Sequence, residues 1–398
     1  MRGPAPLVLR GARFLDGRIG DLHLADGLIA RLAPPGTAPP PAARVIEADG
    51  LVAVPGFIDL HVHGGAGADF MDATDEAFAR SAAYHAAGGT TAWMPTTATE
   101  SLENILACVD AAARSREQRI GGIEMLGVHV EGPYMAPTKH GCHDPGFVRR
   151  PSPAENRAYL DRAPVIKRMT VAPEVPGVPE FIREAARAGI IPSGGHSEAT
   201  IDQTLEAIDL GMSMITHLYS AMSTIVKQGP FRVPGMLEAT LLDDRLATEL
   251  IADLKHVSKD LLRLAMKAKA ERSVCFVTDA MRGAGMPDGT YRFGSAVRGT
   301  PAVVEKGVAR NLENTGFASS TVRMIDLVRN AVETVGLDLA AAVRRASLIP
   351  AVIAGVDGRK GALEPGRDAD VVLLGTSPTL HVRATIARGE VIHHAPGL

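Results

Sequence analysis

The feature that most constrains the fold is a regular alternation of short apolar runs with segments of helical periodicity. Eight apolar runs of four to eight residues lie at 54–61, 91–95, 125–131, 168–173, 189–194, 214–217, 248–253 and 274–279. Helical spacing fills most of the intervals, at 75–87, 101–115, 178–188, 197–210 and 258–270. Eight buried strands alternating with helices are typical of a (β/α)8 TIM barrel. An open, doubly wound sheet is the alternative, but no G-x-G-x-x-G turn follows the first apolar run.

Both ends of the chain have strand composition instead. Residues 7–54 contain short apolar runs broken by Asp-Gly pairs, and strand-like segments return at 369–374 and 382–393. Short strands at opposite ends of a chain can pair into one module. The sequence therefore predicts an α/β protein in which a (β/α)8 TIM barrel over residues 54–359 carries a small β-sandwich domain formed by residues 1–53 and 360–398.

Composition excludes several classes of protein. Of the 398 residues 46% are hydrophobic, and 42 basic residues against 45 acidic ones give a net charge of −3. Because the chain has no dense basic stripe with interleaved aromatic residues, we expect no nucleic-acid partner. Gly, Pro and Arg interrupt the first residues before a long apolar stretch forms, so we expect no signal peptide and no membrane span. The three widely spaced cysteines, Cys108, Cys142 and Cys275, suit the reducing cytoplasm.

Side chains that bind metals end five of the eight predicted strands. Active-site groups of a barrel lie at the carboxyl ends of its strands. The strand ends carry His61 and His63, His129 and Glu131, His196, His217, and Asp279. His61 and His63 are two residues apart, so both rings of an extended strand point to the same face.

Imidazole and carboxylate groups are the ligands that Zn²⁺, Fe²⁺ and related divalent ions take in proteins. A lone histidine is more often structural, but five of eight strand ends bearing such groups are hard to explain by packing. These residues could hold one or two ions. Bound metal would polarise a carbonyl and lower the pKa of water, which points to hydrolysis. His129 lies deeper in the barrel, so we expect it to hydrogen-bond rather than to ligate.

Seven short motifs surround these strand ends: Pro-Gly-Phe-Ile-Asp-Leu-His-Val-His-Gly at 55–64, Gly-Val-His-Val-Glu-Gly-Pro at 127–133, Gly-Cys-His at 141–143, Ala-Pro-Glu at 172–174, Gly-His-Ser at 195–197, Thr-His-Leu-Tyr at 216–219 and Val-Thr-Asp-Ala at 277–280. With these motifs the sequence resembles the N-acetylglucosamine-6-phosphate deacetylase family of the amidohydrolase superfamily. The resemblance covers nearly the whole chain. Cyclic-amide hydrolases of the superfamily bridge their metals with a carboxylated lysine on the fourth strand, but Lys167 lies at the wrong end of that strand.

The resemblance implies a role for each matching residue. Glu131, His196 and His217 would hold the principal metal, and His61 and His63 a second one. Zn²⁺ is favoured, with Fe, Co, Mn or Ni as alternatives. Asp279 would take a proton from the attacking water and return it to the departing amine.

Further positions would contact the substrate. By resemblance, His143 would contact the sugar or its acetyl oxygen, and His256 the 6-phosphate. Arg232 would reach the phosphate from the partner subunit of a homodimer, since a guanidinium suits that group. The remaining substrate contacts are expected at Ser220, Ala221 and Ala318.

The resemblance implies hydrolysis of N-acetylglucosamine 6-phosphate to glucosamine 6-phosphate and acetate. Departures from the family pattern concern the substrate: Ser220 replaces Asn, the stretch before Arg232 is long, and Lys255 stands where a bulky apolar residue is expected. The alternatives are therefore N-acetylgalactosamine 6-phosphate, an unphosphorylated N-acetyl sugar, or another N-acyl substrate. A catalytically silent barrel is the alternative outside the enzymes, and the free carboxylate of Asp279 argues against it.

Overall fold

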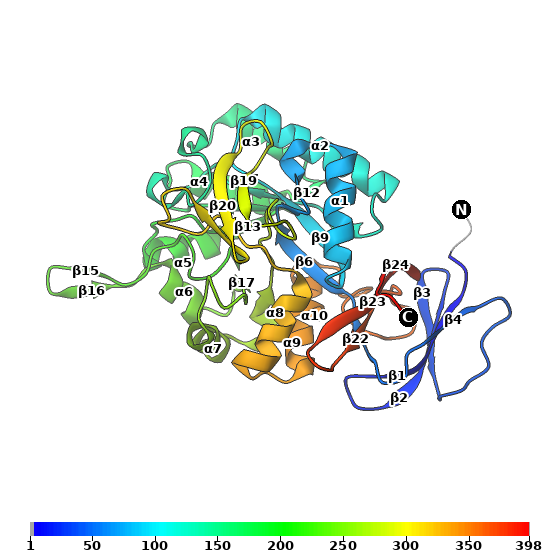
Figure 1. The fold of residues 1–398 in the computed structure, drawn as a ribbon. Coiled ribbons are helices and arrows are strands. Elements are labelled where there is room, and N and C mark those ends of the chain that lie inside the picture. Colours follow the sequence, from blue (N-terminus) through cyan, green and yellow to red (C-terminus); the bar gives the residue numbers. More distant parts are fainter. Residues whose placement is uncertain (1–3, 398) are drawn as a thin grey trace.

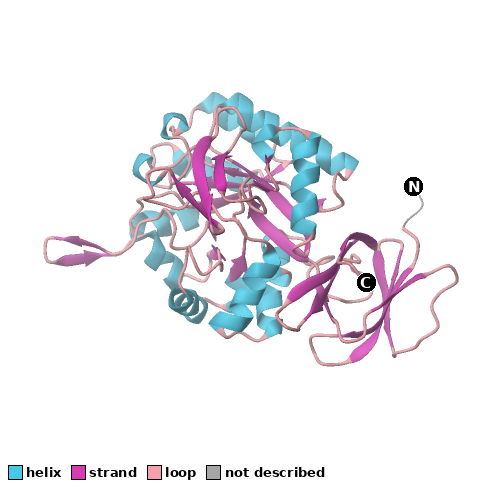
Figure 2. Cartoon of the chain, viewed as in Figure 1, coloured by secondary structure: helices cyan, strands magenta, loops and turns pink. Residues whose placement is uncertain are grey.

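The structure, a computed structural model, describes residues 4–397. Each of the eight predicted apolar runs contains a strand of one parallel barrel (Figures 1 and 2). The barrel strands are β6 (Phe57–Val62), β9 (Thr90–Thr97), β10 (Glu124–Met125) with β11 (Val128–Glu131), β12 (Ile166–Val171), β13 (Ile191–Gly194), β14 (Met214–Ile215), β17 (Ala247–Leu250) and β18 (Val274–Phe276). The predicted TIM barrel is confirmed.

The barrel closes through residues just beyond its last strand. The backbone N–H of Asp279 donates to the carbonyl of His61 (2.8 Å), and that of His63 donates to the carbonyl of Ala280 (2.8 Å). Below them, the Thr278 amide donates to Asp59 Oδ1 (3.1 Å). The first strand and the segment after the eighth are thus fixed side by side at the mouth of the barrel.

Helices surround the barrel (Figure 2). They are α1 (Asp75–Ala86), α2 (Leu102–Gln118), α3 (Pro153–Leu160), α4 (Val178–Arg187), α5 (Ile201–Leu210), α6 (Met236–Leu242), α7 (Lys259–Ala268), α8 (Met324–Asn330), α9 (Leu339–Ala346) and α10 (Leu348–Ile353). The five predicted helices are all present. The helix expected from residue 197 begins only at Ile201, because Thr200 and Gln203 form a capping box there.

The two chain ends build one small β domain. Its strands are β1 (Leu7–Arg13), β2 (Ile19–Ala25), β3 (Leu28–Ala33), β4 (Arg44–Glu47), β5 (Val52–Pro55), β22 (Val371–Gly375), β23 (His381–Ala387) and β24 (Glu390–His394). Antiparallel pairing of β5 with β22 joins the two ends. Leu9 and Leu22 from one end share a buried core with Val371 and Ile386 from the other, as the predicted β-sandwich requires.

Two β elements were not predicted. A hairpin of β15 (Val226–Gln228) and β16 (Phe231–Val233) projects from the barrel (Figure 1). An antiparallel sheet of β19 (Gly289–Phe293), β20 (Thr300–Glu305) and β21 (Val308–Asn311) follows the last barrel strand. The short elements are β7 (Gly64–Gly65), β8 (Ala68–Asp69), the 3-10 turns η1 (Phe70–Asp72), η2 (Pro137–Lys139), η3 (Pro145–Phe147) and η4 (Glu271–Ser273), and the π turn η5 (Ala331–Val335). Among residues 4–397, no helix is long and apolar enough to cross a membrane.

Candidate active site

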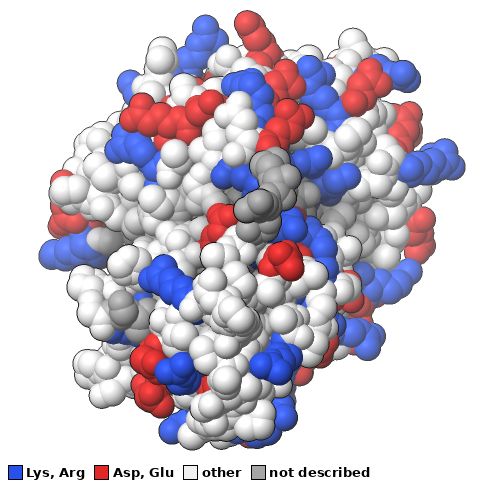
Figure 3. Space-filling model, turned by 90° about the vertical axis from the view of Figure 1, so that its right-hand side faces the viewer, with Lys and Arg blue, Asp and Glu red and all other residues white. Residues whose placement is uncertain are grey.

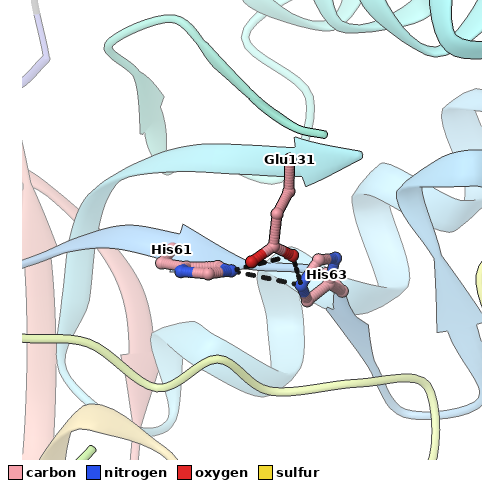
Figure 4. A group of neighbouring side chains, drawn as sticks. All are labelled: His61, His63 and Glu131. Atoms are coloured by element: carbon pink, nitrogen blue, oxygen red, sulfur yellow. Dashed lines mark hydrogen bonds and ion pairs between the residues drawn. The ribbon is translucent and has the colours of Figure 1, made fainter. Parts of the chain in front are cut away.

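The carboxyl ends of the barrel strands bring six predicted residues into one buried cluster. These are His61, His63, Glu131, His196, His217 and Asp279, none of which is more than 7% exposed. His61 lies in β6, and Glu131 is the last residue of β11 (Figure 4). The remaining four follow β6, β13, β14 and β18 within three residues.

The carboxylate of Glu131 lies between two pairs of histidines. Its Oε2 atom is 3.4 Å from His61 Nε2 and 3.2 Å from His63 Nε2 (Figure 4). Its Oε1 atom is 3.3 Å from His196 Nε2 and 3.1 Å from His217 Nε2. Each carboxylate oxygen therefore faces one histidine pair.

Within each pair the Nε2 atoms approach each other, at 3.2 Å for His61 and His63 and 3.0 Å for His196 and His217. His61 Nδ1 donates to Glu249 (3.0 Å), and His196 Nδ1 donates to the carbonyl of Lys139 (2.6 Å). In a neutral ring with its proton on Nδ1, the lone pair is on Nε2. In each pair one lone pair, that of His61 or of His196, is thus directed beside a carboxylate oxygen, an arrangement that fits a divalent cation.

Local charge keeps the two carboxylates of the cluster ionised. Burial alone would raise the pKa of Glu131 and of Asp279. Without a bound cation, the protonated form of His61 opposes burial most strongly in both cases and holds each pKa well below its usual value. A cation held by the neutral rings would act in the same direction. Asp279 Oδ1 is 3.2 Å from His63 Nε2 and accepts a hydrogen bond from Ser319 Oγ (3.0 Å).

His143 is arranged as a hydrogen-bond donor. Its Nδ1 accepts from the backbone N–H of Thr99 (3.0 Å), so the proton of the neutral ring is on Nε2. That Nε2 is 3.2 Å from Glu131 Oε2. Burial lowers the pKa of His143 to about 4, which keeps the ring neutral.

The backbone is strained at the same positions. His196, His217 and Asp279 have φ values of +49°, +28° and +49°. Non-glycine residues rarely adopt this left-handed region, and such strain concentrates at functional sites. It is an observation independent of the side-chain geometry that points to the same cluster.

A cavity of about 420 Å³ opens onto the cluster. Four of the predicted substrate residues line it: His143, Ser220, Ala221 and His256. The Nδ1–H of His256 donates to Asp253 Oδ2 (2.7 Å), and the ring packs on Phe317, with ring centroids 4.3 Å apart.

Two predicted substrate residues lie elsewhere. Ala318 is buried and its amide donates to the carbonyl of Ala309, so its neighbours Phe317 and Ser319 line the cavity in its place. The side chain of Ala318 packs in the hydrophobic core, and its contact with substrate stays a prediction. Arg232 lies on the exposed hairpin, outside the residues that line the cavity.

The structure adds three residues that were not predicted. Phe293 on β19 packs its ring against His63 and His143, at centroid distances of 4.7 and 5.0 Å. Glu249 on β17 pairs with Arg168 on β12 inside the barrel. The indications in the sequence are charged residues inside apolar runs: Arg168 in the run at 168–173 and Glu249 in the run at 248–253.

His129 lies deeper in the barrel, as expected. Its Nε2 is 2.7 Å from Thr170 Oγ1, and its Nδ1 is 3.3 Å from Thr96 Oγ1. Its ring packs edge-on against His61, with centroids 4.6 Å apart. His129 therefore supports a ring of the cluster from below.

Comparison with known proteins agrees with this architecture. The pattern of the Amidohydrolase family matches residues 52–392. The chain is 37% identical to an N-acetylgalactosamine-6-phosphate deacetylase of Escherichia coli, over 96% of this chain and 98% of that protein. It is 32% identical to an N-acetylglucosamine-6-phosphate deacetylase of Lysinibacillus sphaericus, over 93% and 92%. A mutant N-acetyl-D-glucosamine-6-phosphate deacetylase of Mycobacterium smegmatis, solved with N-acetyl-D-glucosamine-6-phosphate, superposes with a TM-score of 0.85 at 33% identity, covering 98% of this chain and 99% of that one.

Proposed function

The chain belongs to the amidohydrolase family, and we propose that it hydrolyses the N-acetyl group of N-acetylglucosamine 6-phosphate to give glucosamine 6-phosphate and acetate. The observation that carries this proposal is the position of Glu131 between two histidine pairs, with the ionised Asp279 beside them. Full-length relatives with this activity support the choice of substrate.

The histidine pairs and Glu131 are the residues that would hold metal. Glu131, His196 and His217 form one position, and His61 and His63 form the other. Zn²⁺ suits the nitrogen and oxygen donors, and Fe²⁺, Co²⁺, Mn²⁺ or Ni²⁺ would accept the same set. A divalent ion held there polarises the amide carbonyl and makes water more acidic.

Asp279 moves the proton. Its carboxylate is ionised before the reaction, so it can accept a proton from the attacking water. The same carboxyl group then delivers that proton to the departing amine nitrogen, so no second acid is required. The Ser319 hydroxyl donates to Asp279 Oδ1 and keeps the carboxylate turned toward the cavity.

His143 and other residues that line the cavity would recognise the sugar. The Nε2 proton of His143 faces Glu131 Oε2 (3.2 Å), and it would turn to the acetyl oxygen or a sugar hydroxyl when Glu131 holds a cation. His256, Ser220 and Ala221 also line the cavity and would contact the 6-phosphate. Arg232 would complete that contact from the partner subunit of a homodimer, because its hairpin projects from the barrel (Figure 1).

Cytoplasmic location stays a prediction from cysteine usage.

N-acetylgalactosamine 6-phosphate is the second candidate substrate, favoured by the 37% identity to a deacetylase of that epimer. The deciding experiment measures acetate release from both phosphorylated epimers and both unphosphorylated sugars, with Zn²⁺ supplied. We expect the phosphorylated glucose-series sugar to have the highest kcat/KM. Preference for the galactose series would establish the second candidate.

Two results would contradict the proposal. Absence of turnover with all four sugars would refute the deacetylase activity. Turnover of unphosphorylated sugars alone would refute the phosphate assignment at His256, Ser220 and Ala221. Protein treated with a chelator, and then resupplied with metal, is the control for an intact fold.

A further inference from the structure

Glu249 is a buried carboxylate for which the proposed mechanism has no use. It lies in β17 inside the barrel, and its side chain is fully buried. Its Oε2 atom accepts two hydrogen bonds, from His61 Nδ1 (3.0 Å) and from the backbone N–H of His217 (2.9 Å). One oxygen atom therefore contacts a member of each histidine pair.

The two contacts fix different properties of the site. The bond to His61 sets the proton on Nδ1 and turns the Nε2 lone pair toward His63 and Glu131. The second hydrogen bond is accepted from the backbone N–H of His217, whose φ is +28°. Glu249 therefore holds a strained backbone in place.

The carboxylate is itself held in position. Its Oε1 atom forms an ion pair with Arg168, which is also fully buried. The other end of that guanidinium, Nη2, donates to Ser193 Oγ and Thr216 Oγ1, both at 2.9 Å. Arg168, Ser193 and Glu249 lie on β12, β13 and β17, so several strands together set where the carboxylate points.

We propose that Glu249, anchored by Arg168, is a positioning residue that couples the two halves of the metal site by fixing the ring of His61 and the backbone of His217. The inference rests on the proposed function, because it concerns metal held by these histidines. In the described part of the chain, Nδ1 of His63 and Nδ1 of His217 have no hydrogen-bond partner. Of the two Nδ1 atoms in the pair of His61 and His63, the one held by a hydrogen bond within residues 4–397 is therefore that of His61, and its partner is Glu249.

The test compares metal binding of wild type and E249Q, by elemental analysis after dialysis and by competition with a chromophoric chelator. A glutamine cannot accept from both histidine groups and from Arg168 at once, because half of its head group is a donor. Loss of such a supporting contact typically costs about 10- to 100-fold in metal affinity. We expect a loss of that size in E249Q.

Two further variants separate positioning from general stability. E155Q removes a buried carboxylate whose partners are Arg149 and Tyr159 and which contacts no residue of the cluster within residues 4–397. This variant should keep wild-type metal affinity. The double variant E249M/R168M removes both charges, and such apolar replacement of a buried pair is generally tolerated. We expect it to fold, as judged by circular dichroism and cooperative unfolding, and still to bind metal 10- to 100-fold more weakly.

Wild-type affinity in E249Q, or in the folded double variant, would overturn the inference. An equal loss of affinity in E155Q would also overturn it, because the effect would then belong to any buried ion pair. Absence of metal from the wild-type protein would instead refute the proposed function, so the two failures can be told apart.

Discussion

At the scale of single residues, Asp279 combines proximity to the histidines with a carboxylate that is ionised before the reaction. Its Oδ1 atom is 3.2 Å from His63 Nε2, and the protonated form of His61 keeps the pKa of Asp279 below the usual value. The Ser319 hydroxyl fixes the orientation of this carboxylate. A carboxylate held in this way suits proton transfer better than metal binding alone.

We predict that Asp279→Asn lowers kcat by about 10²-fold or more, because a positioned acid or base typically contributes 10²- to 10⁴-fold. Metal content should be unchanged, since Glu131 and the four histidines remain. Steady-state kinetics together with elemental analysis would check this. Near-normal kcat would remove Asp279 from the mechanism.

At the scale of secondary-structure elements, two β insertions decide the shape of the site. The sheet β19–β21 brings Phe293 against two histidines of the cluster. Arg282 holds this sheet by pairing with Asp72 (2.7 Å) and by donating to the carbonyl of Gly294 (2.9 Å). The hairpin β15–β16 instead leaves the barrel and exposes Phe231, which is 72% exposed.

An exposed hairpin that carries apolar and basic residues is suited to a second copy of the chain. We predict that Arg232→Ala raises KM for the phosphorylated substrate by roughly 10- to 100-fold with little change in kcat, since a hydrogen bond to a charged group contributes about 1.5–3 kcal/mol. Lys227→Ala is the matched control, because Lys227 lies opposite Arg232 on the same hairpin. Equal KM values in wild type and Arg232→Ala would exclude Arg232 from the phosphate site.

At the scale of the whole molecule, an ionic cluster ties the barrel to the small β domain. Lys360 is buried and contacts Glu124 (2.8 Å), Asp368 (3.0 Å) and Asp370 (2.5 Å). Glu124 belongs to the barrel strand β10, whereas Asp368 and Asp370 lead into β22 of the small domain. Arg359 binds Glu124 as well (2.5 Å).

This cluster predicts a specific acid sensitivity. Burial would raise the pKa of Glu124, but the bond from Arg359 and the charge of Lys360 outweigh burial and lower it to about 2. A carboxyl group with a lowered folded-state pKa stabilises the protein above its unfolded pKa, near 4.5, and that stabilisation is lost as pH falls toward 2. The difference in Tm between wild type and Glu124→Gln should therefore be largest near neutral pH and shrink below pH 4.5.

Thermal unfolding between pH 7 and pH 3 would measure that difference. Glu206→Gln is the control, because Glu206 is exposed on α5 and makes no ion pair within residues 4–397. A difference in Tm that stays constant over the pH range would contradict the role assigned to Glu124.

Charges of both signs are mixed on one face of the molecule. Basic and acidic side chains are intermixed on the face that the small β domain presents (Figure 3). With a net charge of −3, the molecule as a whole does not attract an anionic sugar phosphate. Recognition of the phosphate therefore depends on a few local groups such as His256 and Arg232.

The sequence by itself determined the barrel, the pairing of the chain ends and the clustered residues. Apolar periodicity locates strands locally, and parallel strands of a barrel end at one rim, so His61, Glu131, His217 and Asp279 had to meet there. Only the tertiary structure decided that Arg168 pairs with Glu249 from 81 residues away, that Phe293 covers His63, and that Ala318 faces the core. These contacts depend on how separate elements pack, and no local pattern of residues encodes that packing.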